Sequence, residues 1–258
     1  MNHQKFMEMD ELSLQKVPYF FMIDFLSENI EIYRENEINK SGLLVDFQQL
    51  SNSKQKHALN KKIEWESFPE TLESFKKGFD KVQKNIRLGN SYLVNYTRKT
   101  RIQTNLSLEE IFYHSNAKYK VFYKDFFVFF SPETFVKIID GKILTYPMKG
   151  TIDASLENAA EVLKNDKKEK AEHYTVVDLL RNDLSMVADN VKVDQFQHID
   201  LIRTQQKDLY AMSSEISGNI KPEFAGKIGS MMEKLLPAGS ILGAPKPRTL
   251  EIILDAEG

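Results

Sequence analysis

The chain has 258 residues, with 35 Lys or Arg against 37 Asp or Glu, so its formal net charge is −2. A near-neutral balance argues against a general polyanion binder, which usually carries a basic excess. Apolar residues make up 41% and charged residues 28%, which is typical of folded globular proteins and excludes a wholly disordered chain. The absence of Cys excludes disulfides, thiolate metal sites and a Cys nucleophile.

The N-terminal segment shows no targeting signal. Residues 1–15 lack the basic start and apolar centre of a secretory signal. The most apolar run, 19–26, is interrupted by Asp24 and is far shorter than the about 20 residues that a membrane helix needs. We therefore expect a cytoplasmic protein with neither a membrane nor a nucleic-acid partner.

Strands and a loop are predicted for the first 69 residues. Runs of β-branched, aromatic and other apolar residues occupy 19–25, 31–33 and 43–47, separated by turn-prone residues. The polar stretch 51–62 predicts an exposed loop.

A helix and a strand follow. Apolar residues at spacings of three and four predict an amphipathic helix over 70–88, with Gly89 at the position of a C-terminal cap. Alternating side chains predict a strand over 91–102. Ser107 and Glu110 have the spacing of a capping box, which predicts a short helix.

Two hairpins are predicted next, turning at Lys124-Asp125 and at Asp140-Gly141, since an Asp-Gly pair is a strong hairpin signal. Long hairpins with clustered helices favour an α+β fold over alternating βαβ units. We expect mostly antiparallel sheets with peripheral helices.

The remaining predicted elements are a helical region 155–187 broken near Asn165-Asp166, strands at 191–196 and 209–217, a helix from Pro222 to Leu235, a loop at 237–246 and a last helix at 247–257.

Several acidic residues could hold a metal. Glu169 and Glu172 have the i, i+3 spacing that puts two carboxylates on one helix face, and Asp178 and Asp183 follow. Oxygen ligands of this kind suit Mg²⁺. The alternative is a solvated helix face with Glu/Lys pairing, which composition alone favours.

Lys149 and Glu133 are candidates for chemistry. Lys149 lies between a strand and Gly150, where a desolvated amine can act as a nucleophile or base. Glu133 follows a strand, and a buried carboxyl there can donate a proton. The alternatives are an exposed strand-end lysine and a turn residue bonded to nearby backbone. Similarly, the glycines of 237–246 could cradle an anion or form a plain turn.

Six segments, taken in order, carry a specific resemblance: GNSYLVNYT, SPETFVKI, ILTYPMKGT, AEHYTVVDLLRNDL, SSEISG and LLPAGSILGAPKPRTLEII. Together they closely resemble the chorismate-utilising enzymes, a family that includes anthranilate, aminodeoxychorismate, isochorismate and salicylate synthases. The match covers 70–258, and 1–69 match loosely, so we expect one chorismate-binding domain over 1–258. Relatives continue beyond this point, so we expect the chain to lack the family's C-terminal segment.

Two positions help to choose the reaction within the family. Members that resemble aminodeoxychorismate synthase carry P-I-K-G-T, and here Lys149 stands in P-M-K-G-T, where anthranilate and isochorismate synthases tend to have Ala. Members that add water carry a lysine where this chain has Leu93. The resemblance thus implies a transferase that aminates chorismate, on the route to 4-aminobenzoate and folate.

The resemblance also implies roles for residues and partners. Lys149 would be the covalent nucleophile and Glu133 the general acid, and a glutamine amidotransferase subunit would supply ammonia. The alternatives are anthranilate synthase component I and a catalytically silent fragment or binding subunit. The implied Mg²⁺ ligands are Glu172 and Glu257, with Glu169 through water, and the implied chorismate contacts are Gly150, Thr151, Gly239, Ser240, Gly243 and Lys246.

Overall fold

The computed structural model describes residues 2–47, 50–53, 59–204 and 207–258. The chain forms two compact units. The sheet unit consists of residues 1–59 and 108–236, and the helical unit of residues 60–107 and 237–258.

The largest sheet of the sheet unit is antiparallel and is built around β13 (Leu209–Ile220). One edge of β13 pairs with β12 (Ala188–Ile202). The other edge pairs with β11 (Met148–Asp153) and with β10 (Lys142–Thr145), which also pairs with β9 (Lys137–Ile139). The short link between β10 and β11 therefore lies against the middle of the sheet.

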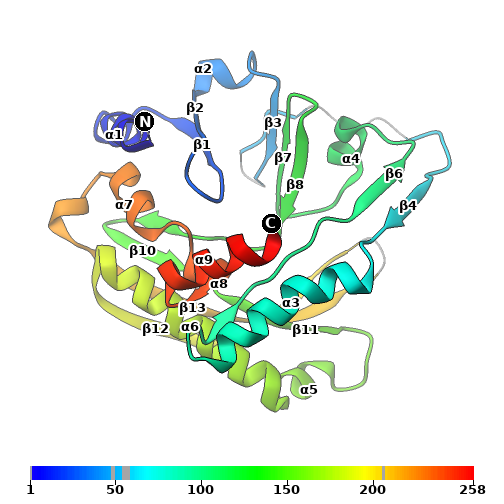
Figure 1. Cartoon of the computed structure of the whole chain (residues 1–258). Helices are drawn as coiled ribbons and strands as arrows, with labels where there is room; N and C mark the ends of the chain where they lie inside the picture. The colour runs from blue at the N-terminus through cyan, green and yellow to red at the C-terminus, as the bar shows by residue number, and fades with distance from the viewer. Residues whose placement is uncertain (1, 48–49, 54–58, 205–206) are drawn as a thin grey trace. The chain divides into compact units, whose positions relative to one another are not determined.

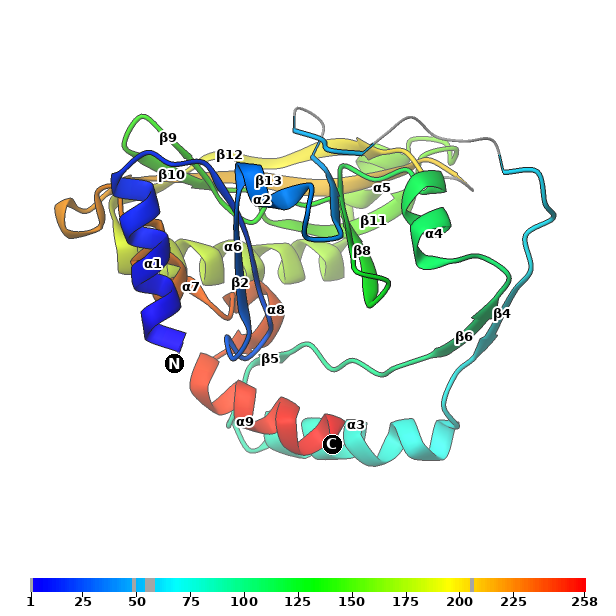
Figure 2. The same cartoon turned by 90° about the horizontal axis from the view of Figure 1, so that it is seen from above.

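Two helices contact this sheet, α5 (Ala159–Asn165) and the longer α6 (Lys167–Val187). The predicted break between them is confirmed, because Asp166 is extended and its carboxylate caps α6 by accepting a hydrogen bond from the Glu169 N–H at 2.9 Å. Figure 2 shows α6 running along the length of the β12–β13 hairpin. The buried apolar face of α6 is formed by Val176, Val177, Leu180, Leu184 and Val187.

Both predicted hairpin turns are confirmed. Lys124 and Asp125 have φ of 50° and 53°, and Asp140 and Gly141 have φ of 49° and 75°. Positive φ at both central residues is the mark of the two-residue turn whose twist matches that of paired strands. The turns thus fix the register of β7 (Tyr119–Tyr123) with β8 (Phe127–Ser131) and that of β9 with β10.

Two smaller antiparallel sheets complete the β-structure of the sheet unit. One contains β3 (Leu43–Asp46), β7 (Tyr119–Tyr123) and β8 (Phe127–Ser131), and the other is the hairpin of β1 (Tyr19–Ile23) and β2 (Ile30–Arg34). The short helices α2 (Glu35–Ile38) and α4 (Leu108–His114) adjoin them. Their common core consists of Phe20, Leu43, Val45 and Val121.

The N-terminal helix α1 (Asn2–Leu14) was not predicted. It packs against α7 (Ile228–Leu235) so closely that a Cβ on Gly229 would lie 1.9 Å from the Phe6 carbonyl oxygen. The buried Asp10 carboxylate accepts a hydrogen bond from the backbone of α7 at 2.9 Å. A tertiary contact therefore stabilises a helix whose own sequence pattern is weak.

The helical unit is centred on two helices, α3 (Leu72–Arg87) and α9 (Lys246–Glu257), which lie side by side in Figures 1 and 2. Gly89, with φ of 74°, follows α3 in the predicted capping position. The core between the helices consists of Val82, Ile252 and Ala256. The other elements are α8 (Gly239–Leu242) and two antiparallel strand pairs, β5 (Leu93–Val94) with β14 (Gly243–Ala244) and β4 (Trp65–Phe68) with β6 (Arg101–Thr104).

The prediction of one strand over 91–102 was wrong, because only Leu93–Val94 and Arg101–Thr104 are strands. The intervening polar groups bond to helices instead of to a neighbouring strand. The Tyr96 hydroxyl donates to the Phe75 carbonyl at 3.2 Å, and the Thr97 N–H donates to a carboxylate of α9 at 2.7 Å.

Two C-terminal predictions also need correction. The region 237–246 is not a plain loop, since it contains α8 and β14. The single helix expected from Pro222 to Leu235 is a 3₁₀ turn (Pro222–Phe224) followed by α7, because Gly226 adopts φ of 74° between them and interrupts the helix.

Every strand pair among the described residues is antiparallel, which confirms the predicted α+β class. Residues 54–58 of the predicted loop lie outside the described residues. Among the described helices none has the length and apolar character that a membrane crossing requires.

Candidate active site

Lys149 lies near the start of β11, where a β-bulge interrupts the pairing with β13. Met148 and Thr151 are three residues apart, but their partners on β13 are only two residues apart. Gly150 inside the bulge adopts φ of 79°, a conformation that favours glycine. Because a bulge breaks the regular alternation of side chains, it sets the direction of the half-buried Lys149 side chain.

Glu133 follows the end of β8, and its side chain is half-buried. Burial raises the pKa of Glu133 to about 7, against the opposite effects of a hydrogen bond from the Met148 backbone and of the positive charge of Lys149. The Ser131 hydroxyl accepts from the Glu133 N–H and donates to its carbonyl, both at 3.1 Å, which fixes the turn. A carboxyl that is substantially protonated at neutral pH therefore lies near the amine of Lys149.

The bulge lies directly against the first turns of α6. A Cβ on Gly150 would lie 2.7 Å from Oε2 and 3.3 Å from Cβ of Glu169. The glycine thus supplies both the left-handed backbone and the space that the Glu169 side chain occupies. Thr151, the next residue along β11, is exposed.

Glu169 and Glu172 lie on α6 as predicted, and the ammonium of Lys168 contacts both carboxylates. Its Nζ lies 3.5 Å from Glu169 Oε1 and 3.4 Å from Glu172 Oε1. The hydrogen bond to Glu172 contributes most to raising the pKa of Lys168. The two carboxylates therefore share a region that attracts positive charge.

Four predicted chorismate contacts lie in the helical unit. Gly239 begins α8, Ser240 follows it, and the half-buried Lys246 begins α9. Gly243 has φ of 116°, and a Cβ there would lie 1.7 Å from the Leu93 carbonyl oxygen, so only glycine permits this backbone approach. A common substrate contact for these residues and Lys149 stays a prediction.

Glu257, the third predicted metal ligand, also belongs to the helical unit. Its Oε1 accepts hydrogen bonds from the Thr97 N–H at 2.7 Å and from the Thr97 hydroxyl at 2.8 Å. Arg98 donates to the Glu257 carbonyl at 2.6 Å. Both bonds to the carboxylate use Oε1, and they orient the Glu257 side chain.

Sequence reasoning missed a buried polar cluster beside the acidic pair. His173 of α6 is fully buried, and its Nε2 lies 2.7 Å from Oγ of the equally buried Ser214 of β13. Burial, with a smaller effect of His198, lowers the pKa of His173 to about 4, so the ring is neutral at pH 7. The available signal was a histidine one turn before the apolar residues Val176 and Val177 of a predicted helix.

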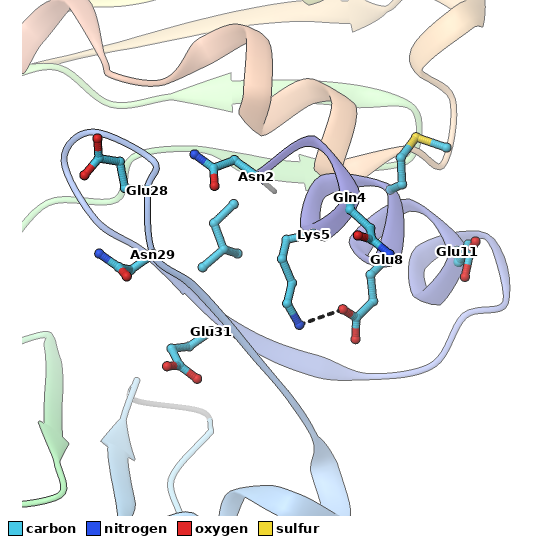
Figure 3. A pocket seen from close by; sticks show the side chains of 10 residues that line it. Asn2, Gln4, Lys5, Glu8, Glu11, Glu28, Asn29 and Glu31 are labelled. Carbon is cyan, nitrogen blue, oxygen red and sulfur yellow. Dashed lines mark hydrogen bonds and ion pairs between the residues drawn. The ribbon is translucent and has the colours of Figure 1, made fainter.

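Among the described residues of the sheet unit, hollows include the following three. One of about 900 Å³ adjoins the site, because its wall includes Pro132 and Met148, the residues before Glu133 and Lys149. A second of about 1210 Å³, between the β1–β2 hairpin and the β3–β7–β8 sheet, is lined mainly by aromatic and aliphatic side chains. The third, of about 630 Å³ between α1 and that hairpin, is mostly polar, and Lys5 bonds to Glu8 there at 2.9 Å (Figure 3).

Similarity to known proteins identifies the family of this chain. The family model described as chorismate binding enzyme matches residues 10–258, nearly the whole chain. This chain belongs to the chorismate-binding enzymes. Within that family it is 43% identical over 256 residues to an uncharacterised PabA-like protein of Pasteurella multocida, covering 99% of this chain and 79% of the relative. A PabA-like protein of Haemophilus influenzae is 45% identical over 246 residues, covering 94% and 74%.

More distant relatives include anthranilate synthase component 1 of Arthrobacter globiformis, which is 36% identical over 135 residues, or 49% of this chain and 24% of that protein. Among solved structures, an isochorismate synthase of Bacillus anthracis has a TM-score of 0.62 at 16% identity, covering 99% of this chain and 70% of that chain. Anthranilate synthase component I of Streptococcus pneumoniae has a TM-score of 0.58 at 20% identity, covering 92% and 56%. These likenesses show the fold, and they confirm the predicted class.

The residues of the sheet unit are suitable for part of a Mg²⁺ site. Glu169 and Glu172 offer carboxylate oxygens beside an ammonium that already lies close to both. Within the described residues no group of three or more His, Asp or Glu side chains gathers around one point. Two carboxylates are sufficient for Mg²⁺, which usually completes its shell with water and substrate.

Proposed function

We propose that this chorismate-binding enzyme catalyses the amination of chorismate by ammonia to 4-amino-4-deoxychorismate. The observation that supports this most is the pair Lys149 and Glu133, a half-buried amine near a carboxyl whose pKa is about 7. The proposed substrate is chorismate, because the chain belongs to the chorismate-binding enzymes. Lys149 stands in the P-M-K-G-T segment, where anthranilate synthases tend to have Ala. This lysine favours amination at C4 over the anthranilate synthase reaction.

The proposed reaction has two displacement steps. In the first, the lone pair of Lys149 Nζ forms a bond to C2 of the ring, both ring double bonds shift, and the C4 hydroxyl leaves as water with a proton from Glu133. In the second, ammonia forms a bond to C4, both double bonds shift back, and the bond from C2 to Lys149 breaks and leaves its electron pair on Nζ. A proton from the ammonia nitrogen returns to Glu133, so chorismate and ammonia yield the product and water. A covalent intermediate replaces one difficult displacement by two easier ones.

In the proposed reaction, the bulge directs the Lys149 side chain, and the partial burial of Glu133 lets it transfer the proton. Gly150 lets the backbone turn so that Lys149 leaves the regular alternation of β11. Glu133, with a pKa of about 7, can give a proton in one step and take it back in the next.

We further propose that Glu172 and Glu257 hold Mg²⁺, with Glu169 acting through a water molecule. When bound, Mg²⁺ supplies positive charge that neutralises a carboxylate of the substrate. The hydrogen bonds from Thr97 would orient Glu257 for this role, since partners of a ligand commonly fix its direction. Gly150, Thr151, Gly239, Ser240, Gly243 and Lys246 are the proposed chorismate contacts.

The proposed source of ammonia is a glutamine amidotransferase subunit in the same cytoplasmic pathway to 4-aminobenzoate and folate. The PabA-like names of the two bacterial relatives are compatible with this assignment.

The direct test is to incubate the protein with chorismate, MgCl₂ and an ammonium salt at pH 8 and to identify the products by mass spectrometry. We expect 4-amino-4-deoxychorismate without release of pyruvate. Lys149→Ala should abolish product formation but leave chorismate binding measurable. Formation of anthranilate and pyruvate would instead assign the anthranilate synthase reaction. That reaction is the second candidate, because the similar protein of Arthrobacter globiformis is an anthranilate synthase component 1. Absence of both products and of chorismate binding would support a catalytically silent chain.

A further inference from the structure

We infer that Ser214 and His173 form a positioning pair, which fixes α6 and the Lys149 segment to the same point of the sheet. This inference rests on the proposed function, because its purpose is to keep Glu169 and Glu172 in place beside the bulge. Neither residue touches a proposed reacting atom, so both act through their neighbours.

Ser214 joins three elements at one residue. Its backbone N–H donates to the carbonyl of Pro147 at 3.0 Å, in the link between β10 and β11 and two residues before Lys149. Its hydroxyl is hydrogen bonded to His173 Nε2 on α6 at 2.7 Å and accepts from the Gln197 N–H on β12 at 3.1 Å. The link, the helix and the neighbouring strand therefore share one anchor.

The bond to His173 fixes the helix in a way that its apolar contacts do not. The buried face of α6 also contains Asp183 ten residues further on, but the residues next to His173 on this face, Val176 and Val177, are aliphatic, and aliphatic contacts are non-directional. A hydrogen bond between two fully buried side chains permits only a narrow range of distance and angle. His173 thus adds a directional contact that restricts the translation and rotation of this part of α6 against β13.

The position of the pair explains why this matters for the site. His173 directly follows Glu172, and Glu169 lies one turn earlier, against Gly150 of the bulge. A shift of α6 along the sheet would withdraw Glu169 from the bulge and move both carboxylates together. The pair therefore couples the acidic residues to the Lys149 segment through a single serine.

Packing alone does not explain a histidine at this place. His173 Nδ1 is buried and has no hydrogen-bond partner within the described residues, which costs free energy. The ring packs against Phe196 with its centroid 5.7 Å from the Phe196 centroid, so an aromatic hydrocarbon of similar shape would fill the space. Buried polar groups that add little stability are known to specify register in some proteins, and that role fits His173.

The test compares His173→Phe with His173→Gln in the full chain. Phenylalanine keeps the ring shape but loses the bond, whereas the amide of glutamine can reach Ser214 from a position close to that of Nε2. Thr175→Val is the matched control, since the Thr175 hydroxyl donates within α6, to the Ala171 carbonyl at 2.9 Å, and not to the sheet.

We expect His173→Phe to retain the unfolding temperature while Mg²⁺ affinity by calorimetry and the amination rate each fall by about 10- to 100-fold, the usual effect of losing a partner that orients a ligand. His173→Gln should recover most of both losses, and Thr175→Val should change neither. Equal defects in the Phe and Gln variants, or wild-type behaviour of His173→Phe, would overturn the inference.

Hydrogen exchange separates this inference from the proposed function. In His173→Phe, amide protection of residues 168–177 should fall while that of 178–187 is retained. This readout needs neither Mg²⁺ nor turnover, so it remains decisive if the wild-type protein aminates nothing. Unchanged protection of 168–177 would refute the positioning role.

Discussion

Burial shifts the pKa values of two groups in the sheet unit, whereas a surface hydrogen bond shifts the pKa of Glu70 in the helical unit. In the sheet unit, burial moves the pKa of Glu133 up to about 7 and that of His173 down to about 4. In the helical unit, Arg98 contacts Glu70 at 2.6 Å and lowers the pKa of that carboxyl through a hydrogen bond at the surface. A pKa near neutrality, as at Glu133, is typical of reaction centres, whereas ion pairs such as Arg98–Glu70 are typical of surfaces.

Under the proposed function, the reacting residues belong to the sheet unit, and the helical unit orients ligands. Glu257 of the helical unit is held by two hydrogen bonds from Thr97, and Gly243 permits a backbone approach that no other residue allows. Substitutions of the proposed reacting residues Lys149 and Glu133 should therefore change rates, and substitutions at Thr97 and Gly243 of the helical unit should mainly change stability and ligand affinity.

The largest effect is expected for Lys149→Ala. Loss of the nucleophile should lower the amination rate by on the order of 10³-fold or more, as for other covalent catalysts. The unfolding temperature should stay close to that of the wild type, since the side chain is only half-buried. Lys137→Ala, at an exposed position of β9, is the control. A rate within threefold of the wild type would remove the covalent step.

Glu133→Gln should reduce the rate by about 10²–10⁴-fold, because the amide cannot protonate the leaving hydroxyl. In the wild type, the rate should fall as pH rises above about 7, where Glu133 loses its proton. A pH profile of kcat with the same descending limb in the variant would contradict the role of Glu133 as the acid.

The same variant should be more stable than the wild type at pH 8. Between 4.5, the ordinary pKa of Glu, and about 7, the unfolded chain releases the Glu133 proton while the folded chain keeps it, so rising pH disfavours the folded state. The full difference corresponds to about 3 kcal/mol. Urea unfolding should show that Glu133→Gln gains stability over the wild type at pH 8 and not at pH 4.

The stability losses caused by Gly243→Ala and Gly150→Ala allow a direct comparison of the two units. Gly243→Ala should destabilise by about 3 kcal/mol, because backbone strain adds to a clash with the rigid Leu93 carbonyl. Gly150→Ala should cost only about 1–2 kcal/mol, since the Glu169 side chain can move away. Gly150→Ala should nevertheless slow amination. A larger loss of unfolding free energy for Gly150→Ala than for Gly243→Ala would contradict this prediction.

The smallest effect is expected for Thr97→Val, which removes one of the two hydrogen bonds to Glu257 Oε1. The backbone bond remains, so we expect a stability loss of about 1 kcal/mol and a weaker binding of Mg²⁺. Thermal unfolding and calorimetry would measure the two effects. A loss of amination with normal Mg²⁺ affinity would contradict the proposed orienting role.

Local sequence signals predicted the elements that depend on few residues. The hairpin turns at Lys124-Asp125 and Asp140-Gly141, the break at Asp166 and the cap at Gly89 all follow from backbone preferences of one or two residues. Elements that depend on distant partners were missed. The helix α1 is stabilised by α7, and the segment 95–100 bonds to helices, so neither is visible in a local period.

The amino-acid sequence by itself determined the antiparallel α+β fold, the helix that carries Glu169 and Glu172, and the order of segments that marks a chorismate-binding enzyme. Only the tertiary structure decided that Lys149 sits in a bulge, that Glu133 is buried enough to hold a proton near pH 7, and that Ser214 joins α6 to the Lys149 segment. The reason is physical: turns and helix caps are set by neighbouring residues, whereas desolvation and close contact depend on groups that the fold brings together from far along the chain.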